Sequence, residues 1–197
     1  CGEDYIVRCG CLIPRADTEI LVEEAVRLLP ENGSFWDLCT GRGCVAAAIL
    51  KARPDTSCVA VELSRIAAEI AAENFERLGV SDRIKLISGD ALAVPFPEGA
   101  RVDYIVSNPP YIPTETIQTL DAEVRREPPE ALDGGTDGLF FYQKFLSAYA
   151  ERTRCGFLFE IGWDQGEALR ELAEKNQLGC EIRRDYGGRD RVAHLRK

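Results

Sequence analysis

Apolar residues recur along this chain with two alternating periods. Short apolar runs predict buried strands at residues 34–38, 57–62, 83–88, 102–107 and 156–161. Apolar residues at helical spacing predict helices between them, at residues 17–29, 44–51, 64–78, 138–150 and 165–176. Asp17 or Thr18 is a candidate N-cap of the first helix, and Gly79 is a candidate C-terminal cap of the third. The pattern is therefore one of strands that alternate with helices.

This alternation predicts an α/β protein with a doubly wound, mostly parallel sheet. Two further strand-like runs, residues 180–184 and 191–195, are separated by a short turn around Gly187 and Gly188. A turn of this length predicts antiparallel pairing, so we expect seven strands with an antiparallel last strand. A chain of 197 residues has room for one such domain, which we expect to span residues 1–197.

The charge of the chain bears on its partners. A net charge of −9 argues against a generic nucleic-acid-binding surface, which should be basic, although it leaves a local basic groove open. The sequence has no apolar run long enough to span a bilayer and no signal peptide, so we expect a cytoplasmic protein with no membrane partner.

The eight cysteines lack the paired spacing of a zinc site. We therefore expect reduced thiols and no metal site. The single histidine, His194, lies in the last strand-like run, and we expect it at the surface or on an edge strand.

The most informative stretch is Asn108-Pro109-Pro110-Tyr111, which directly follows an apolar strand. Two consecutive prolines fix φ near −65° and remove two backbone donors, and the first pushes Asn108 into an extended conformation. The stretch is thus a stiff corner with an amide side chain, free carbonyl groups and an aromatic face. These groups suit the binding of a planar amide or amine.

Four candidate functional features follow the first four predicted strands. They are a glycine loop at residues 39–43, Glu62, Asp90 and Asn108. Each alone can be explained by turn chemistry or by a solvated or helix-capping carboxylate. Because ligands of doubly wound sheets bind at the carboxyl ends of the strands, their convergence on one edge favours a binding site.

The glycine loop fits two cofactors. Gly41-Arg42-Gly43-Cys44-Val45-Ala46 matches the dinucleotide pattern Gly-x-Gly-x-x-Ala, with Glu62 near the ribose-binding distance, so NAD is one candidate. S-adenosylmethionine is the other, since it offers a ribose diol to Glu62 and an adenine edge to Asp90. Asp37 at the strand end would repel a pyrophosphate but suits the ammonium group of S-adenosylmethionine. The proline corner also favours methyl transfer.

These motifs resemble a known family. Residues 37–43 together with Asn108-Pro109-Pro110-Tyr111 resemble class I S-adenosylmethionine-dependent methyltransferases, which have a Rossmann-like fold and act on planar nitrogens. Residues 12–19, 123–135 and 187–191 narrow the resemblance to the release-factor glutamine methyltransferases, the PrmC/HemK family. The resemblance covers essentially the whole chain.

The resemblance implies N5-methylation of the glutamine in the Gly-Gly-Gln motif of class 1 peptide release factors, a protein modification linked to translation termination. It implies that the loop formed by Cys39, Thr40, Gly41, Arg42 and Gly43 cradles the cofactor, that Glu62 binds the ribose, and that Asp90 and Ala91 lie along the adenine. It also implies that Asn108, Pro109, Pro110 and Tyr111 hold the glutamine, with Asn108 next to the cofactor as well.

From the chemistry of an amide we predict that the Asn108 side-chain oxygen and the Pro109 carbonyl accept the two N–H groups of the substrate. The resemblance further places residues 1–16 as a lead-in or flap over the site, with Arg15 or Glu19 lining the pocket. The alternative is that this stretch is only the extended lead-in to the first helix.

The chain also departs from the family pattern. Cys39 stands at the first glycine position of the loop, which is intact if Cys39 needs no positive φ, and Arg42 replaces a small residue and either points to solvent or crowds the ligand. Residue 1 is Cys rather than Met, and we expect a fragment without the amino-terminal helical domain that helps dock the release factor, with weakened activity. Two alternatives stay open, a nucleic-acid amine methyltransferase and a non-catalytic cofactor-binding domain.

Overall fold

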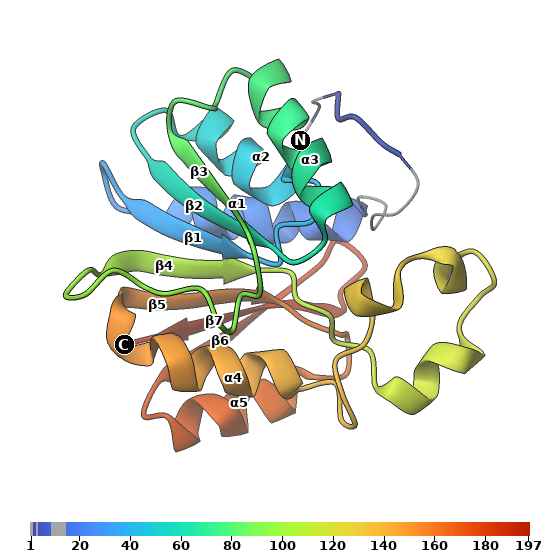
Figure 1. The fold of residues 1–197 in the computed structure, drawn as a ribbon. Coiled ribbons are helices and arrows are strands. Elements are labelled where there is room, and N and C mark those ends of the chain that lie inside the picture. Colours follow the sequence, from blue (N-terminus) through green and yellow to red (C-terminus); the bar gives the residue numbers. More distant parts are fainter. Residues whose placement is uncertain (1, 3, 9–14) are drawn as a thin grey trace.

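The computed structural model describes residues 2, 4–8 and 15–197, which contain one seven-stranded sheet (Figure 1). Its strands follow the order β3-β2-β1-β4-β5-β7-β6. The strands are β1 (Ser34–Leu38), β2 (Ser57–Glu62), β3 (Ile84–Ser88), β4 (Val102–Ser107), β5 (Thr153–Glu160), β6 (Gly179–Arg184) and β7 (Asp190–Arg196). The first five strands pair in parallel, and β7 pairs antiparallel with both β5 and β6. The predicted fold class is confirmed.

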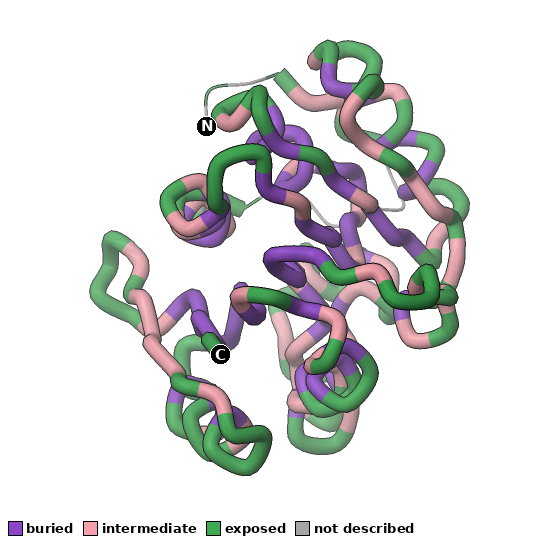
Figure 2. Tube along the Cα trace, turned by 90° about the vertical axis from the view of Figure 1, so that its left-hand side faces the viewer, coloured by how far each residue is buried: buried purple, intermediate pink, exposed green. Residues whose placement is uncertain are grey.

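Helices cover both faces of the sheet. The helices α1 (Glu19–Leu28), α2 (Cys44–Ala52) and α3 (Arg65–Arg77) lie on one face, and α4 (Phe140–Tyr149) and α5 (Gly166–Lys175) lie on the other (Figure 1). Neighbouring strand residues point to opposite faces, so Phe35 packs in the core beneath α1 and α2, whereas Trp36 packs with α4. Figure 2 shows the buried residues gathered along the strands and the exposed ones in the connecting loops. The sheet is thus a rigid platform between two apolar layers.

A long segment projects from the carboxyl ends of the strands. This segment, residues 112–134, follows the proline corner, and we call it the yellow segment after its colour at the right of Figure 1. It contains the 3-10 turns η2 (Thr114–Thr119), η3 (Val124–Arg126) and η4 (Pro129–Ala131). Its end returns to its start, because Ile112 donates to the carbonyl of Leu132 at 3.0 Å and accepts from Gly134 at 2.8 Å. The segment therefore forms one wall beside the strand ends.

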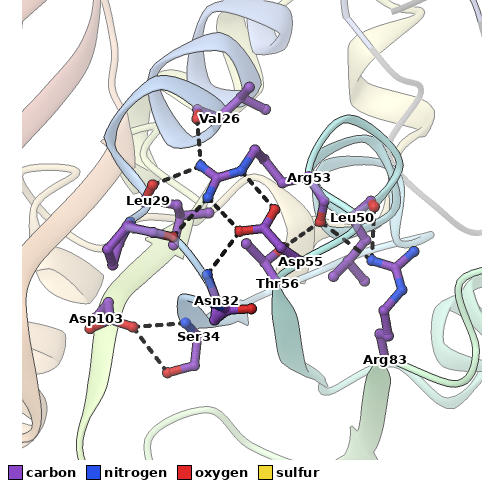
Figure 3. A network of polar contacts seen from close by, with 11 residues as sticks. Val26, Leu29, Asn32, Ser34, Leu50, Arg53, Asp55, Thr56, Arg83 and Asp103 are labelled. Atoms are coloured by element: carbon purple, nitrogen blue, oxygen red, sulfur yellow. Dashed lines mark hydrogen bonds and ion pairs between the residues drawn. The ribbon is translucent and has the colours of Figure 1, made fainter.

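A polar network holds the end of the sheet at which the parallel strands begin, opposite their carboxyl ends (Figure 3). The Arg53 guanidinium donates to the carbonyl oxygens of Val26, Leu29 and Pro30 at 3.0, 2.7 and 2.7 Å, and it pairs with Asp55 at 2.7 Å. Cationic side chains at a helix C-terminus satisfy carbonyl groups that have no partner within the helix. Arg53 therefore joins the end of α1 to the end of α2, away from the edge that carries the candidate site.

Most predicted bounds agree with the structure. The bounds of β1, β2 and β4 are those predicted, whereas β5 begins three residues early, at Thr153. Thr18 is the N-cap of α1, but its side chain makes no capping hydrogen bond, because the helix continues from the 3-10 turn η1 (Ala16–Thr18).

The prediction for His194 was wrong. Because β7 lies between β5 and β6, the side chain is buried, and its Nε2 atom lies 3.3 Å from the Tyr104 hydroxyl. Separately, none of the described helices is long and apolar enough to cross a membrane.

Candidate active site

The loop after β1 has a left-handed backbone at three positions. Cys39, Gly41 and Gly43 have φ values of 58°, 59° and 81°. Cys39 therefore adopts the positive φ that the intact loop was expected to avoid. A non-glycine residue in this region is uncommon and strained. The strain is held by the Thr40 backbone nitrogen, which donates to the Val61 carbonyl of β2 at 3.0 Å. The loop keeps its glycine-like shape despite Cys39.

Asp37 is a buried acid beneath this loop. Its carboxylate accepts a hydrogen bond from the Thr40 hydroxyl. Burial raises the pKa of Asp37 to about 7, against the lowering effect of the hydrogen bonds from Thr40 and the Ala46 backbone. The group therefore titrates near neutral pH, and a cation beside it would favour its ionised form.

Glu62 ends β2 and binds the same loop. Its Oε2 accepts from the Gly41 backbone nitrogen at 2.7 Å, and its Oε1 accepts from the Ser64 backbone nitrogen at 2.8 Å. Burial raises its pKa. On the next strand end Asp90 is exposed, and its Oδ1 accepts from the Leu92 backbone nitrogen at 2.8 Å.

Three adjoining hollows lie over the strand ends. The first is lined by the glycine loop, Asp37 and residues of α1 and α2. The second is lined by Glu62, Asp90 and Ala91 together with Pro128, Glu130 and Ala131 of the yellow segment. The third is lined by Pro109, Tyr111, Glu160 and apolar residues of that segment. Asn108 is the one described residue that lines all three.

The proline corner is held from two sides. The Asn108 amide nitrogen donates to the Thr18 hydroxyl at 3.4 Å, and the Tyr111 hydroxyl donates to the Glu160 carboxyl at 3.5 Å. Burial raises the pKa of Tyr111 to about 12, so its hydroxyl keeps its proton. Pro109 and Pro110 are buried. The amide and the aromatic ring are thus fixed at the junction of the hollows.

Glycines allow the backbone to approach this corner closely. A Cβ atom on Gly134 would lie 2.7 Å from the Tyr111 Cα, and one on Gly138, which has a φ of 73°, would lie within contact of the Tyr111 carbonyl oxygen. The same carbonyl accepts from the Gln165 side-chain nitrogen at 3.1 Å. Gly134 and Gly138 are therefore part of the support for Tyr111.

All predicted site residues except Gly43 line these hollows, and Pro110 lines a different hollow from the one expected. Gly43 lines none of the hollows in the described structure; a Cβ there would overlap the Phe75 ring, so this glycine permits close packing of α2 against α3. Pro110 lines the second hollow rather than the third. Arg42 is buried and lines the first hollow, so its expected solvent-facing alternative was wrong.

The predicted flap is described in part. Arg15 and Glu19 both line the first hollow, and Arg15 reaches Glu127 of the yellow segment at 3.3 Å. Residues 1, 3 and 9–14 of the flap lie outside the described part of the chain. Both residues expected to line the pocket therefore do so, Arg15 from the flap and Glu19 as the first residue of α1.

The sequence reasoning missed two site residues. Glu160 ends β5 and is buried in the third hollow, and Thr18 lines the first. The signal for Glu160 was present, since it is an acid at the end of an apolar strand, as Glu62 is. Thr18 could have been found only from the fold, because its partner Asn108 lies 90 residues away in sequence.

The donor set decides between the two candidate cofactors. A pyrophosphate in the first hollow would meet the buried Asp37, which opposes an anion, whereas an ammonium group there would be stabilised. Glu62 offers acceptors for a ribose diol in the second hollow. With the proline corner where the hollows meet, the fold and the site define a class I S-adenosylmethionine-dependent methyltransferase.

Comparisons with known proteins narrow this class. Residues 16–147 match the family model described as the methyltransferase small domain. A release factor glutamine methyltransferase of Geobacter sulfurreducens is 41% identical over 98% of this chain and 68% of its own length. The chain belongs to the release factor glutamine methyltransferase family.

Solved structures agree with this assignment. The release-factor-specific protein-(glutamine-N5) methyltransferase from Alicyclobacillus acidocaldarius is similar to 98% of this chain and 99% of its own, with 30% identity and a TM-score of 0.58. A ribosomal protein L11 methylase from Lactobacillus delbrueckii, 18% identical with a TM-score of 0.65 over 94% of this chain and 81% of its own, shares the fold.

Proposed function

We propose that this domain transfers a methyl group from S-adenosylmethionine to the side-chain amide nitrogen of the glutamine in the Gly-Gly-Gln motif of class 1 peptide release factors. Family membership supports the reaction and the substrate. The observation that carries the assignment of residues is the position of Asn108. It lies where the first two hollows, suited to the cofactor, meet the third hollow, suited to an amide.

The first two hollows suit the two ends of the cofactor. Asp37 would hold the ammonium group, Glu62 the ribose hydroxyls, and Asp90 with Ala91 the adenine. Cys39, Thr40, Gly41 and Arg42 line the first hollow together with Asp37, and Cys39 and Gly41 also line the second. Burial raises the pKa of the Cys39 thiol, so this side chain remains a neutral wall group rather than a nucleophile.

The corner supplies the chemistry that an amide requires. An amide nitrogen is a weak nucleophile because its lone pair is delocalised into the carbonyl. The Asn108 side-chain oxygen and the Pro109 carbonyl would accept its two N–H groups and hold the nitrogen in line, and positioning of this kind contributes on the order of 7–11 kcal/mol. The same acceptors stabilise positive charge that develops on nitrogen. When bound, the cofactor supplies an electrophilic methyl group.

Tyr111 would pack against the planar amide from the side of β5. Because its hydroxyl stays protonated and its backbone is held by Gln165, Tyr111 would serve as a packing surface for the amide rather than as a general base. No strong base is required in this mechanism, because an N-alkylated amide cation loses its proton readily.

The acidic surface favours a protein substrate over nucleic acid. A net charge of −9 would repel a phosphate backbone, which contributes most of the affinity of non-specific nucleic-acid binding. We include in the proposal that no nucleic acid is methylated and that the reaction takes place in the cytoplasm, where release factors act.

Mass spectrometry tests the proposal directly. The chain is incubated with S-adenosylmethionine and a release-factor peptide that contains Gly-Gly-Gln, with a Gly-Gly-Asn peptide and RNA and DNA oligonucleotides as controls. We expect one added methyl group on the glutamine and none on the controls. The variant Asn108→Ala should lose the transfer even when S-adenosylmethionine is saturating, and calorimetry sets that concentration because Asn108 also lines the two cofactor hollows. Retained transfer by this variant, or methylation of an oligonucleotide instead, would contradict the proposal.

A further inference from the structure

Asn74 is a buried amide on α3 that the proposed chemistry does not use. Asparagine is a poor helix former, and a buried amide is costly unless it is hydrogen-bonded. Asn74 nevertheless lies inside α3 and is 0% exposed. Its Nδ2 donates to the Arg42 carbonyl at 2.9 Å, and its Oδ1 accepts from the Ile6 backbone nitrogen at 2.8 Å. The amide therefore joins two segments that are far apart in the sequence.

The partners fix the orientation of the Asn74 amide. A backbone carbonyl can only accept a hydrogen bond and a backbone N–H can only donate one, so each end of the amide has a single suitable partner. An ionised aspartate would place an oxygen against the Arg42 carbonyl, and an apolar side chain of similar size would make neither bond. The position thus requires both a donor and an acceptor.

The first of these bonds holds the glycine loop. Arg42 stands between Gly41 and Gly43, whose φ values of 59° and 81° are left-handed. Such a backbone keeps its shape only where the surrounding structure fixes it. The next residue of α3, Phe75, packs directly against Gly43, where a Cβ atom would overlap its ring. Two consecutive residues of α3, Asn74 and Phe75, therefore hold the part of the loop that leads into α2.

The second bond holds residues 4–8, which we call the leading segment and which lies beside α3 in dark blue (Figure 1). The Ile6 side chain packs against α3, and the Arg8 guanidinium donates to both carboxylate oxygens of Glu73 at 2.6 and 2.7 Å. Tyr5 lines the first hollow, and its hydroxyl donates to the first carbonyl of α2 at 3.2 Å. The leading segment thus reaches from α3 to the wall of the cofactor hollow.

We propose that Asn74 is a positioning residue for cofactor binding, which fixes the glycine loop at Arg42 and couples the loop to the leading segment. The inference deepens the proposed function at its cofactor site and rests on it only for the identity of the ligand, S-adenosylmethionine. Asn74 lines none of the three hollows in the described structure, so it acts through the loop. A shift of the Arg42 carbonyl moves Gly41 and Cys39, which line both cofactor hollows, and leaves the proline corner in place.

Kinetics separate this role from a general contribution to stability. Asn74→Leu removes both bonds at similar side-chain size, and we expect the KM for S-adenosylmethionine to rise ~10-fold. At saturating cofactor, kcat on the Gly-Gly-Gln peptide should stay within about twofold, because the proline corner is untouched. A variant that is merely less stable contains fewer folded molecules, which lowers the apparent kcat and leaves KM unchanged. Arg53→Ala, which loses several hydrogen bonds at the opposite end of the sheet, is the matched control and should keep the unmodified KM.

A second set of variants tests the coupling to the leading segment. Ile6→Pro and Ile6→Ala both lose the isoleucine side chain, but only proline removes the backbone N–H that donates to Asn74. We expect the calorimetric Kd for S-adenosylmethionine to be ~3- to 10-fold higher for Ile6→Pro than for Ile6→Ala. In the Asn74→Leu background, where this bond is already absent, the two variants should bind equally.

The outcomes distinguish this inference from the proposed function. An unchanged calorimetric Kd for Asn74→Leu, or an equal rise for Arg53→Ala, would overturn the positioning role. No difference between Ile6→Pro and Ile6→Ala, or the same difference in both backgrounds, would overturn the coupling. Cofactor binding by the unmodified chain without methylation of the peptide would contradict only the proposed function, whereas absence of cofactor binding would contradict both.

Discussion

Glu62 Oε2 accepts a hydrogen bond from the backbone nitrogen of Gly41 at 2.7 Å. The acid at the end of β2 thus holds the loop at the end of the neighbouring strand β1. Its other oxygen accepts from Ser64, at the start of α3. The candidate ribose-binding residue is therefore also a structural tie between the loop, the strand and the helix that surround the second hollow.

The first prediction concerns this double role. Glu62→Gln keeps one acceptor but replaces the other with a donor that opposes a backbone N–H group. We expect the affinity for S-adenosylmethionine to fall by ~10- to 100-fold, about 1.4–2.8 kcal/mol, as measured by calorimetry. Glu69→Gln, an exposed residue of α3, is the control and should bind normally. An unchanged affinity for Glu62→Gln would remove Glu62 from the cofactor site.

A second prediction follows from the pKa of Asp37. In the folded chain this pKa is about 7 rather than the ordinary 3.8, so the folded state binds more protons than the unfolded state between pH 4 and 7. Stability therefore decreases as the pH rises through this range, and at pH 8 the ionised group costs on the order of 4 kcal/mol. Asp37→Asn should raise the free energy of unfolding at pH 8 by about 1–3 kcal/mol and change it little at pH 4.

The same substitution should weaken cofactor binding. If the ionised Asp37 holds the ammonium group, the Kd of the unmodified chain should increase as the pH falls below about 7, by up to tenfold for each pH unit. Asp37→Asn should bind more weakly at pH 8 and should show no such dependence. Denaturant titrations and calorimetry across this range measure both effects. A variant that is more stable and yet binds as well as the unmodified chain would contradict the ammonium assignment.

The strand bounds and the strand-end acids could be predicted from the sequence because both depend on local patterns. The apolar run around Trp36 indicates a buried strand, and Glu62 is identified as a strand-end acid by the apolar residues just before it. His194 was misplaced because the position of β7 inside the sheet depends on the crossover from β5, which the local pattern does not encode. Cys39 illustrates a related limit, since its positive φ is imposed by the loop around it and opposes its own preference.

Long-range contacts at the site were out of reach for a related reason. Thr18 meets Asn108 only because the start of α1 lies at the carboxyl end of the sheet. No local sequence pattern at either residue predicts this contact. Glu160 differs, because the rule that selected Glu62 and Asp90 also applies to the end of β5.

The third prediction concerns stability remote from the site. Arg53 satisfies three carbonyl oxygens at the end of α1 and also pairs with Asp55 (Figure 3). Arg53→Ala should lower the free energy of unfolding by about 2–3 kcal/mol, because several hydrogen bonds to a charged group are lost together. Arg65→Ala breaks an exposed ion pair and should cost less than about 0.5 kcal/mol. Both variants should bind S-adenosylmethionine normally when folded; weakened binding by Arg53→Ala would show that the two edges of the sheet are coupled.

The last prediction concerns the glycine that supports Tyr111. Gly138 and Gly79 both have positive φ values, 73° and 67°, so alanine strains the backbone about equally at the two sites, by about 1 kcal/mol. At Gly79 the new methyl group meets open space, whereas at Gly138 it overlaps the Tyr111 carbonyl oxygen and crowds the Gln165 amide nitrogen at 2.8 Å. Gly138→Ala should therefore cost about 3 kcal/mol in all and displace Tyr111 from the third hollow.

This displacement should appear in the kinetics. We expect Gly138→Ala to lower kcat/KM for the release-factor peptide ~10- to 100-fold, because the wall of the amide site has moved, while the Kd for S-adenosylmethionine stays unchanged. Gly79→Ala isolates the strain and should retain normal kcat/KM at a temperature where both variants are folded. Equal kinetic losses in the two variants would show that general destabilisation, rather than the position of Tyr111, limits the rate.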